Sequence, residues 1–290
     1  MRIGASLPVG DIGTGPSVIR DYGQAAEDLG FDYIITGDHV MGANPAKPNP
    51  EGVRVGTNEH AVHDPFVVLS FLAGCTTKLG FSTGIVIMPQ RQTVLVAKQA
   101  AGLDRLCDGR FRLGVGVGWN EIEYEGLNQN FHNRGRRSEE QVEVMRALWC
   151  NDLITYDGKW HKITDAGLNP LPPQQPIPIW FGGHADAVMR RVASMGDGWF
   201  PIFELDDSGK AALDKLRGYI EGAGRDPAEV GIETFNTVAG KTPDDWATAA
   251  RLWKQQGATH ISANTMNAGF SSLDAHIDAL RRFKEAASDA

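Results

Sequence analysis

Eight short apolar segments alternate with eight segments of helical period along this chain of 290 residues. Such alternation favours βα units with a parallel sheet. Eight units without an antiparallel interruption predict a closed (β/α)8 TIM barrel rather than an open doubly wound sheet. No linker divides the chain, so we expect a single domain over residues 1–290. The predicted strands lie near 2–7, 32–36, 79–87, 111–117, 177–181, 197–200, 229–234 and 259–263, and the predicted helices near 16–29, 65–76, 92–107, 138–150, 184–195, 207–223, 243–256 and 271–287.

Three longer segments interrupt this alternation. Residues 40–63 follow the second predicted strand, and residues 118–137 follow the fourth. Because the strands of a barrel are parallel, both segments should lie at its carboxyl-terminal face, where barrel enzymes build their active sites. Residues 151–176 precede the fifth strand and contain a hairpin signature with Asp157-Gly158 at its turn.

Composition narrows the class of protein. The net charge is −8 and no basic run occurs, which disfavours a nucleic-acid partner. The three cysteines are widely spaced and indicate reduced thiols rather than disulfides. No targeting signal or apolar run long enough to span a bilayer is present, so we expect a cytoplasmic protein without a membrane partner.

Glycines recur where the predicted strands end. Gly114, Gly116 and Gly118 alternate along the fourth strand, which continues into Trp119. One edge of that strand therefore carries almost no side chains, and a flat or bulky molecule could approach its backbone.

Two pairs of residues are candidates for chemistry. Asp38-His39 follows the second strand, where an imidazole beside a carboxylate suits proton transfer; the alternative is a histidine bonded to loop backbone. His60 and His63 lack a second pair at ligand spacing, so we predict no metal site.

An anion site is expected at the start of a later helix. Gly182 and Gly183 precede that helix and could expose backbone N–H groups, although a simple tight turn would need the same residues. Arg134, Arg136 and Arg137 cluster before another helix, at the end of the dipole that disfavours cations, so an anionic partner would explain them. No nucleophile motif is evident, and a protein without its own reactive group usually takes one from a cofactor.

Several of these blocks together resemble a known family. The run from Pro89 to Asn120, the triplet Gly37-Asp38-His39, and the segments 178–183 and 196–201 resemble, in order, the luciferase-like monooxygenase superfamily. The match looks closest to the branch of probable coenzyme F420-dependent oxidoreductases. Members of the superfamily use either F420 or FMN.

The resemblance implies a deazaflavin or flavin ring over the barrel mouth. It implies a bulge, often with a non-prolyl cis peptide, at Thr83-Gly84-Ile85 behind the ring. It also implies that His39 assists proton transfer and that Asn120 and Glu121 close the substrate side. The expected catalytic residues are His39, Asp38 and Glu121, and the expected cofactor-binding residues are Asp38, His39, Thr83, Gly84, Ile85, Gly116, Gly118, Trp119, Asn120, Arg136, Gly182, Gly183 and His184.

Three functional hypotheses follow from the resemblance. The first is hydride transfer between coenzyme F420 and a small organic substrate; the second is a monooxygenase that uses reduced FMN; the third is a non-catalytic F420- or flavin-binding protein. Trp119 stands where the sugar-phosphate dehydrogenase branch carries glutamate, so glucose-6-phosphate is not the expected substrate. The resemblance also implies a homodimer.

Overall fold

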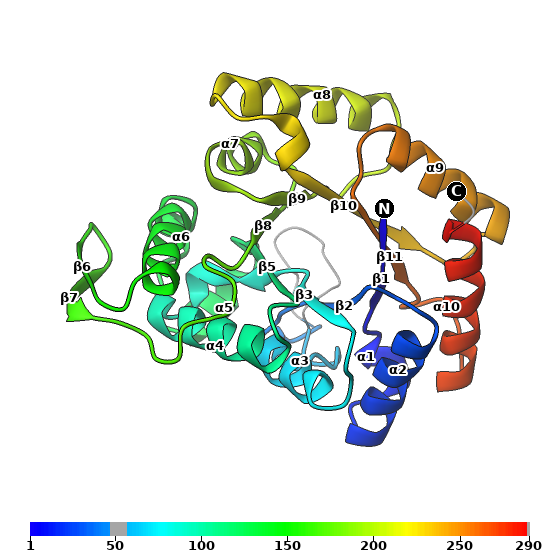
Figure 1. Ribbon diagram of the computed structural model, residues 1–290. Coiled ribbons are helices and arrows are strands. Elements are labelled where there is room, and N and C mark those ends of the chain that lie inside the picture. The colour runs from blue at the N-terminus through cyan, green and yellow to red at the C-terminus, as the bar shows by residue number, and fades with distance from the viewer. Residues whose placement is uncertain (47–56, 289–290) are drawn as a thin grey trace.

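A computed structural model describes residues 1–46 and 57–288. Eight parallel strand positions close into a barrel, and helices surround it (Figure 1). Strands β3 and β4 share the third position, and pairing of β3 with β5 closes the ring. The predicted TIM barrel is therefore confirmed. The barrel strands are β1 (Arg2–Ser6), β2 (Tyr33–Thr36), β3 (Gly80–Thr83), β4 (Val86–Ile87), β5 (Phe111–Gly116), β8 (Ile179–Gly182), β9 (Gly198–Phe200), β10 (Gly231–Thr237) and β11 (His260–Asn264).

Each predicted helix is present. The largest difference is at α6, which begins at Arg134 rather than at residue 138. Caps hold two of the predicted starts: the Asp64 side chain accepts from the Val67 N–H at 3.1 Å, and Thr242 forms a capping box with Asp245. The main helices are α2 (Pro16–Asp28), α3 (Pro65–Ala73), α4 (Thr93–Leu106), α6 (Arg134–Cys150), α7 (Asp186–Met195), α8 (Asp207–Gly222), α9 (Pro243–Gln255) and α10 (Leu273–Ser288).

Two of the three predicted insertions contain secondary structure of their own. Within 118–137 lie α5 (Glu121–Gly126) and the 3-10 helix η2 (Phe131–Asn133), which the sequence did not predict. The hairpin before β8 is confirmed as β6 (Ile154–Asp157) paired with β7 (Lys162–Ala166). Of the insertion over 40–63, residues 47–56 lie outside the described residues. Shorter elements elsewhere are α1 (Val9–Ile12), η1 (Met88–Gln90) and η3 (Pro227–Glu229).

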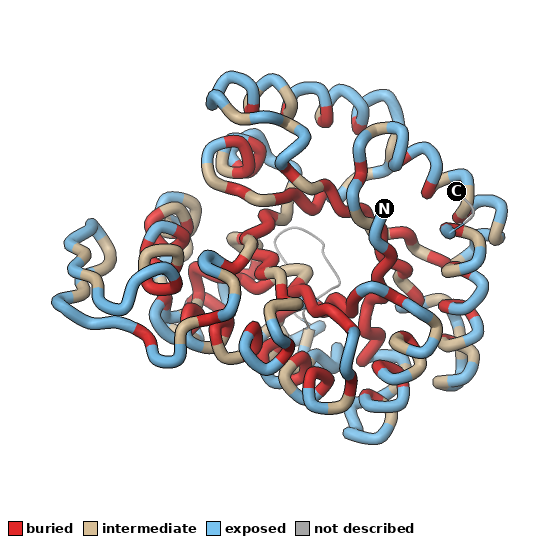
Figure 2. The backbone as a smooth tube through the Cα atoms, viewed as in Figure 1, coloured by how far each residue is buried: buried red, intermediate tan, exposed pale blue. Residues whose placement is uncertain are grey.

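The main core lies between the barrel and its helices, where buried segments of both face each other (Figure 2). A second cluster fills the barrel interior with Tyr33, Ile35, Trp180 and Phe200. Glycine makes room for these rings: a Cβ at residue 198 would lie 2.2 Å from the Trp180 ring. Burial of these large rings favours the closed barrel through the hydrophobic effect.

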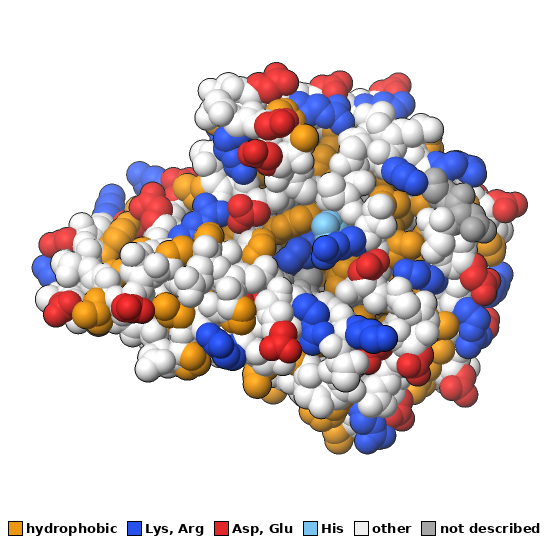
Figure 3. Space-filling model, viewed as in Figure 1, with side chains coloured by type: hydrophobic (Ala, Val, Ile, Leu, Met, Phe, Trp, Pro, Cys, Tyr) orange, Lys and Arg blue, Asp and Glu red, His pale blue; other side chains and the backbone are white. Residues whose placement is uncertain are grey.

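A charged layer lies inside the barrel toward the strand starts. Arg112 donates to the Glu233 carboxylate at 2.8 Å, and Tyr33 donates to the same carboxylate at 2.8 Å. The guanidinium stacks 4.6 Å from the Tyr33 ring centroid and 4.4 Å from the Trp180 ring centroid. His260 packs edge-on against Trp180 in the same layer. In Figure 3, Lys or Arg side chains likewise gather around a histidine over the middle of the barrel.

The third barrel position is interrupted by a cis peptide bond between Gly84 and Ile85, which is not an X-Pro bond. This confirms the feature that the family resemblance implied at Thr83-Gly84-Ile85. No helix within residues 1–46 and 57–288 is long and apolar enough to cross a membrane. All three cysteines are free thiols.

Candidate active site

His39 lies just past the end of β2 and is paired with a buried carboxylate. Its Nδ1 is 3.1 Å from Oε2 of Glu123, a side chain with no exposed surface. The other carboxylate oxygen of Glu123 accepts from the Val40 N–H at 2.7 Å, which fixes the carboxylate in place. The bond to Glu123 raises the pKa of His39, although burial opposes that shift. This pair is therefore a preorganised group for holding or moving a proton.

Both carboxylate oxygens of Asp38 accept hydrogen bonds from within the protein. One of its oxygens accepts from Arg91 at 2.7 Å, and the other accepts from the Ile87 N–H at 2.9 Å and from Arg91 Nε at 3.2 Å. Arg91 also reaches Asp64 at 3.0 Å. A carboxylate with both oxygens bonded in this way is a poor base, so Asp38 positions the end of β2 against η1.

Glu121, expected in the site, is not beside His39. Its side chain is 65% exposed and faces His132 at 3.9 Å. The side chain of Asn120 caps α5 by accepting from the Ile122 N–H at 3.3 Å, and the helix that starts there carries Glu123 to His39. Residues two positions apart point to opposite sides of a helix, which explains why Glu123 and not Glu121 reaches the imidazole.

The sequence carries a local signal for Glu123. Asn120 followed three positions later by glutamate matches a capping-box spacing, and the third helical position is one from which a side chain turns back. Here that side chain bonds the backbone of Val40 instead of the backbone of its own cap. The alternation of Glu121, Glu123 and Glu125 alone does not show which carboxylate is buried.

An apolar platform lies at the barrel mouth. Ile85 is partly exposed there and fits between two glycines: a Cβ on Gly116 would lie 2.6 Å from it, and a Cβ on Gly182 2.8 Å. Phe235 packs with Ile85 against the interior cluster beneath. The glycines therefore make room for Ile85, whose side chain stays partly exposed at the mouth.

The end of β5 brings Trp119 next to His39. Gly118 has φ +65°, a conformation that favours glycine, and its carbonyl accepts from Arg134 Nε at 3.2 Å. The rings of His39 and Trp119 meet edge to face, with centroids 6.2 Å apart. Trp119 is partly exposed, whereas Trp199 is fully buried in the core.

One backbone N–H of the expected anion site, that of Gly183, is already hydrogen-bonded within the protein. Gly183 has φ +119°, and its N–H already donates to the Phe200 carbonyl at 3.2 Å. A cation that the sequence had not singled out, Arg191, lines a small pocket with Gly182. Its Nε is bonded to Glu139 at 2.8 Å.

The three arginines at the start of α6 are used differently from one another. Arg134 stacks 3.6 Å from the Phe131 ring centroid and bonds to loop backbone, and Arg137 donates to Gln129. Arg136 is exposed. The first two thus have protein partners that explain them without an anion.

A pocket of about 440 Å³ opens beside His39. Arg91, Leu95 and Gln129 contribute to its wall, together with Gln90. The Gln90 side chain is 1% exposed, and neither its amide nitrogen nor its oxygen has a hydrogen-bond partner among the described residues. A buried carboxamide without partners costs free energy unless a ligand bonds it, so Gln90 is a candidate substrate contact that the sequence did not indicate.

The remaining candidates lie apart from this pocket. His184 is exposed in the turn between β8 and α7. His60 is bonded to the Thr57 hydroxyl and His63 to the Thr14 carbonyl. Within the described ranges no three His, Cys, Asp or Glu residues are grouped so that they could hold a metal ion.

The sequence of this chain matches a known protein family. The family model described as luciferase-like monooxygenase matches residues 2–288. An uncharacterized protein of Mycobacterium tuberculosis is 36% identical over 183 residues, which is 61% of this chain and 62% of that relative. An FMNH2-dependent dimethylsulfone monooxygenase of Pseudomonas fluorescens is 26% identical over 84% of this chain and 64% of its own length. The chain thus spans less than two thirds of these relatives.

Solved structures share the fold over nearly the whole chain. The monooxygenase RslO1 from Streptomyces bottropensis superposes with a TM-score of 0.82 and 18% identity, covering 100% of this chain and 99% of that one. The coenzyme F420-dependent tetrahydromethanopterin reductase from Methanopyrus kandleri superposes with a TM-score of 0.78 and 16% identity, covering 99% and 98%. At such identities these likenesses show the fold alone.

Proposed function

This chain belongs to the luciferase-like monooxygenase family, and from that premise we propose that it is an oxidoreductase that transfers a hydride between coenzyme F420 and a small organic substrate. The observation that carries the proposal is the pair His39 and Glu123, held beside Trp119 at a mouth floored by Ile85. An F420-dependent reductase with the same fold supports the choice of cofactor.

The residues at the mouth fit a flavin-type cofactor. A planar ring needs a flat apolar support, and Ile85, backed by Gly116 and Gly182, provides one. A phosphate-bearing tail needs cations or free N–H groups, and Arg191 lies beside Gly182, with its Nε bonded to Glu139. Arg136 is exposed at the start of α6. Such a cofactor, when bound, supplies the hydride chemistry that no side chain of this chain can perform.

The proton that accompanies hydride transfer is assigned to His39. Glu123 holds Nδ1, so Nε2, which has no hydrogen bond to the described residues, is the nitrogen that exchanges the proton with the substrate. Asp38 acts through position, because Arg91 and the Ile87 N–H hold both its oxygens. Gln90 lines the pocket beside His39 and would orient a polar group of the substrate.

Reduced FMN is the second candidate cofactor. The similarity to an FMNH2-dependent monooxygenase favours it, and the monooxygenase RslO1 has the same fold. A parallel fluorescence titration of the purified protein with F420 and FMN distinguishes the two cofactors. Saturable binding of F420 that is at least tenfold tighter than that of FMN supports hydride transfer with F420. Micromolar binding of FMN without binding of F420 overturns it and favours the monooxygenase.

The third possibility is a binding protein without turnover. In that case His39→Ala would leave binding and all measurable redox turnover unchanged. As an enzyme, the protein should keep cofactor binding within a few-fold in this variant but lose about a hundredfold or more in turnover. A change in binding alone would remove His39 from the catalytic role.

A further inference from the structure

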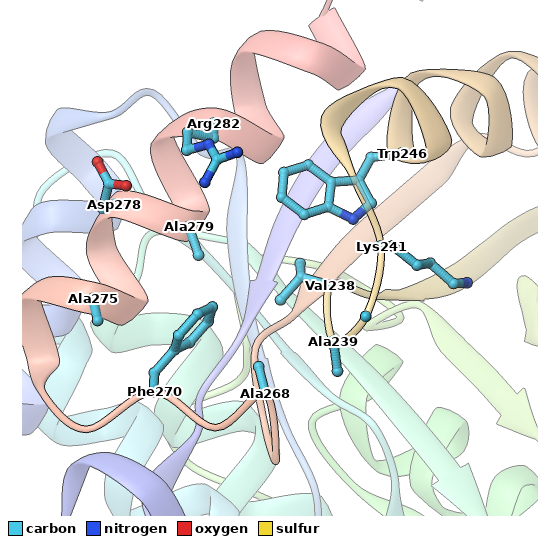
Figure 4. Close-up of a pocket in the computed structure, with 11 residues that line it drawn as sticks. Val238, Ala239, Lys241, Trp246, Ala268, Phe270, Ala275, Asp278, Ala279 and Arg282 are labelled. Carbon is cyan, nitrogen blue, oxygen red and sulfur yellow. The ribbon is translucent and has the colours of Figure 1, made fainter.

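A second pocket lies on the flank of the barrel, between α9 and α10, where the chain leaves β10 and β11 (Figure 4). Its volume is about 300 Å³, at the lower end of the range of small-molecule sites. The segment 238–241, Trp246 of α9, the loop after β11 and one face of α10 line it. None of its lining residues belongs to the pocket beside His39.

The wall of this pocket combines aromatic and small side chains. Trp246 is 3% exposed and is backed by Phe283, with ring centroids 5.8 Å apart. Figure 4 shows Trp246 and Phe270 on opposite sides, with Ala279 of α10 beside them. Alanines on the inner face of α10 leave space that a larger side chain would fill. A flat apolar body fits between these walls.

The polar groups that face this space are mainly donors. The Trp246 indole N–H is buried and has no hydrogen-bond partner in the described part of the chain. Arg282 and Lys241 line the pocket. The Arg282 guanidinium carbon is 5.9 Å from the Trp246 ring centroid, whereas the Lys241 side chain points away from the space between Trp246 and Phe270 (Figure 4). The one carboxylate of the lining, Asp278, is already bonded to Arg281 at 2.9 Å.

The charge balance of the wall therefore favours an anion. Asp245, the acidic residue nearest in sequence to Lys241, is bonded to the backbone and hydroxyl of Thr242 in the cap of α9. Arg282 forms no ion pair within residues 1–46 and 57–288, whereas the charge of Lys241 contributes, after the hydrogen bonds from Thr242, to lowering the pKa of Asp245. A buried donor and a cation without a bound carboxylate are satisfied by a carboxylate on a ligand.

We propose that this pocket binds a small planar organic anion, of the aryl carboxylate class, with its ring between Trp246 and Phe270 and its carboxylate toward Arg282 and the Trp246 indole N–H. The site is separate from the barrel mouth, and the proposal does not depend on the identity of the cofactor. The residues that line this pocket have no part in the proposed oxidoreductase site.

The test follows the indole resonance of Trp246 in cofactor-free protein. The tryptophans are labelled with ¹⁵N, the Trp246 cross-peak is identified from Trp246→Phe, and the protein is titrated with 2-naphthoate and with neutral 2-naphthamide. We expect a saturable shift of this cross-peak with 2-naphthoate, at an affinity at least tenfold higher than for 2-naphthamide. Arg282→Gln should weaken binding of 2-naphthoate about tenfold, whereas Lys241→Gln, at a side chain that points away from the pocket, should weaken it by about twofold or less.

Arg251→Gln is the matched control. It removes a positive charge from the exposed face of α9, where Arg251 bonds Thr248 at 3.2 Å, and it should not change the affinity. Arg282 is exposed, so its variant should fold, and Arg282→Lys, which keeps the positive charge, should retain most of the affinity. Equal affinity for acid and amide, insensitivity to Arg282→Gln, or a shift of Trp119 without Trp246 would each overturn the proposal.

Discussion

At the scale of single residues, the site depends on which carboxylate meets His39. Glu121 and Glu123 are two positions apart in α5, yet one is exposed and the other is buried. The distinction matters because a buried carboxylate at 3.1 Å orients the imidazole and favours its protonated form, whereas an exposed one at the surface does neither.

We predict that Glu123→Gln lowers the pKa of His39. The pair raises that pKa in the folded protein, so its stabilising effect is complete below the pKa of an unfolded histidine and is lost as pH rises through the folded value. An NMR titration of the His39 imidazole measures the change. Glu121→Gln is the control on the same helix and should leave the titration midpoint in place. A midpoint that is unchanged in Glu123→Gln would remove Glu123 from its positioning role.

We predict that Gly116→Ala weakens cofactor binding at the barrel mouth more than it destabilises the fold. The new methyl group would lie 2.6 Å from Ile85, which is packed between Gly116 and Gly182, so Ile85 must move from its place in the mouth. Cofactor binding should weaken about tenfold, and Ile85→Val in the same chain should restore part of it. In the control, Gly218→Ala on α8, an added Cβ meets nothing within 4 Å. That change should stabilise the protein by ~0.5–1 kcal/mol without affecting binding.

At the scale of elements, one carboxylate attaches the β6–β7 hairpin to the barrel. Glu140 of α6 accepts from the N–H groups of Lys159, Trp160 and His161 at 2.8–3.0 Å. His161 Nδ1 also lies 2.8 Å from Glu140, and His161 Nε2 lies 2.6 Å from the Thr93 hydroxyl on α4. The hairpin was predicted from its turn, but its attachment was not, because the partners lie 19 to 21 residues apart or farther in sequence.

We predict that Glu140→Ala releases this hairpin. Several charge-assisted hydrogen bonds are lost together, so the free energy of unfolding should fall by ~2–3 kcal/mol. Hydrogen exchange over residues 154–166 should accelerate more than exchange in the barrel strands. Glu143→Ala removes an exposed bond to Tyr156 from the same helix, and its effect should stay below ~1 kcal/mol. Equal effects of the two variants would contradict this attachment.

At the scale of the whole molecule, the interior of the barrel changes character along its axis. The charged layer of Arg112 and Glu233 lies toward the strand starts, apolar rings fill the middle, and the glycine-lined mouth lies at the strand ends. Closing the barrel therefore partly buries His260 next to Arg112. Burial and, to a lesser degree, the positive charge of Arg112 lower the pKa of His260 to about 2.

We predict that His260 makes the fold sensitive to acid. Below the unfolded pKa of ~6.5 the unfolded chain binds one more proton than the folded chain, so stability falls as pH falls, by up to ~1.4 kcal/mol per pH unit from this residue. Chemical denaturation of His260→Phe should show a shallower loss of stability between about pH 6 and pH 4. His132→Gln, at a side chain that is 83% exposed, is the control and should follow the unsubstituted protein.

Sequence alone determined the order and type of the main elements. The alternation of strand and helix patterns predicted the barrel, because the hydrophobic period of a segment depends on its own residues. The Asp64 and Thr242 caps and the hairpin turn are likewise local. The break in the third strand was predicted from the resemblance to the family and not from the hydrophobic pattern of the residues.

Only the tertiary structure decided which groups meet. The bond between His39 and Glu123 joins residues 84 positions apart, and the bond between Arg112 and Glu233 joins residues 121 positions apart. Such pairs depend on barrel closure and on the direction of each helix, which no short window of sequence contains. The same reason explains Gly116 of β5: the sequence showed that a side chain is absent, and the fold showed that Ile85, from the break between β3 and β4, occupies the space.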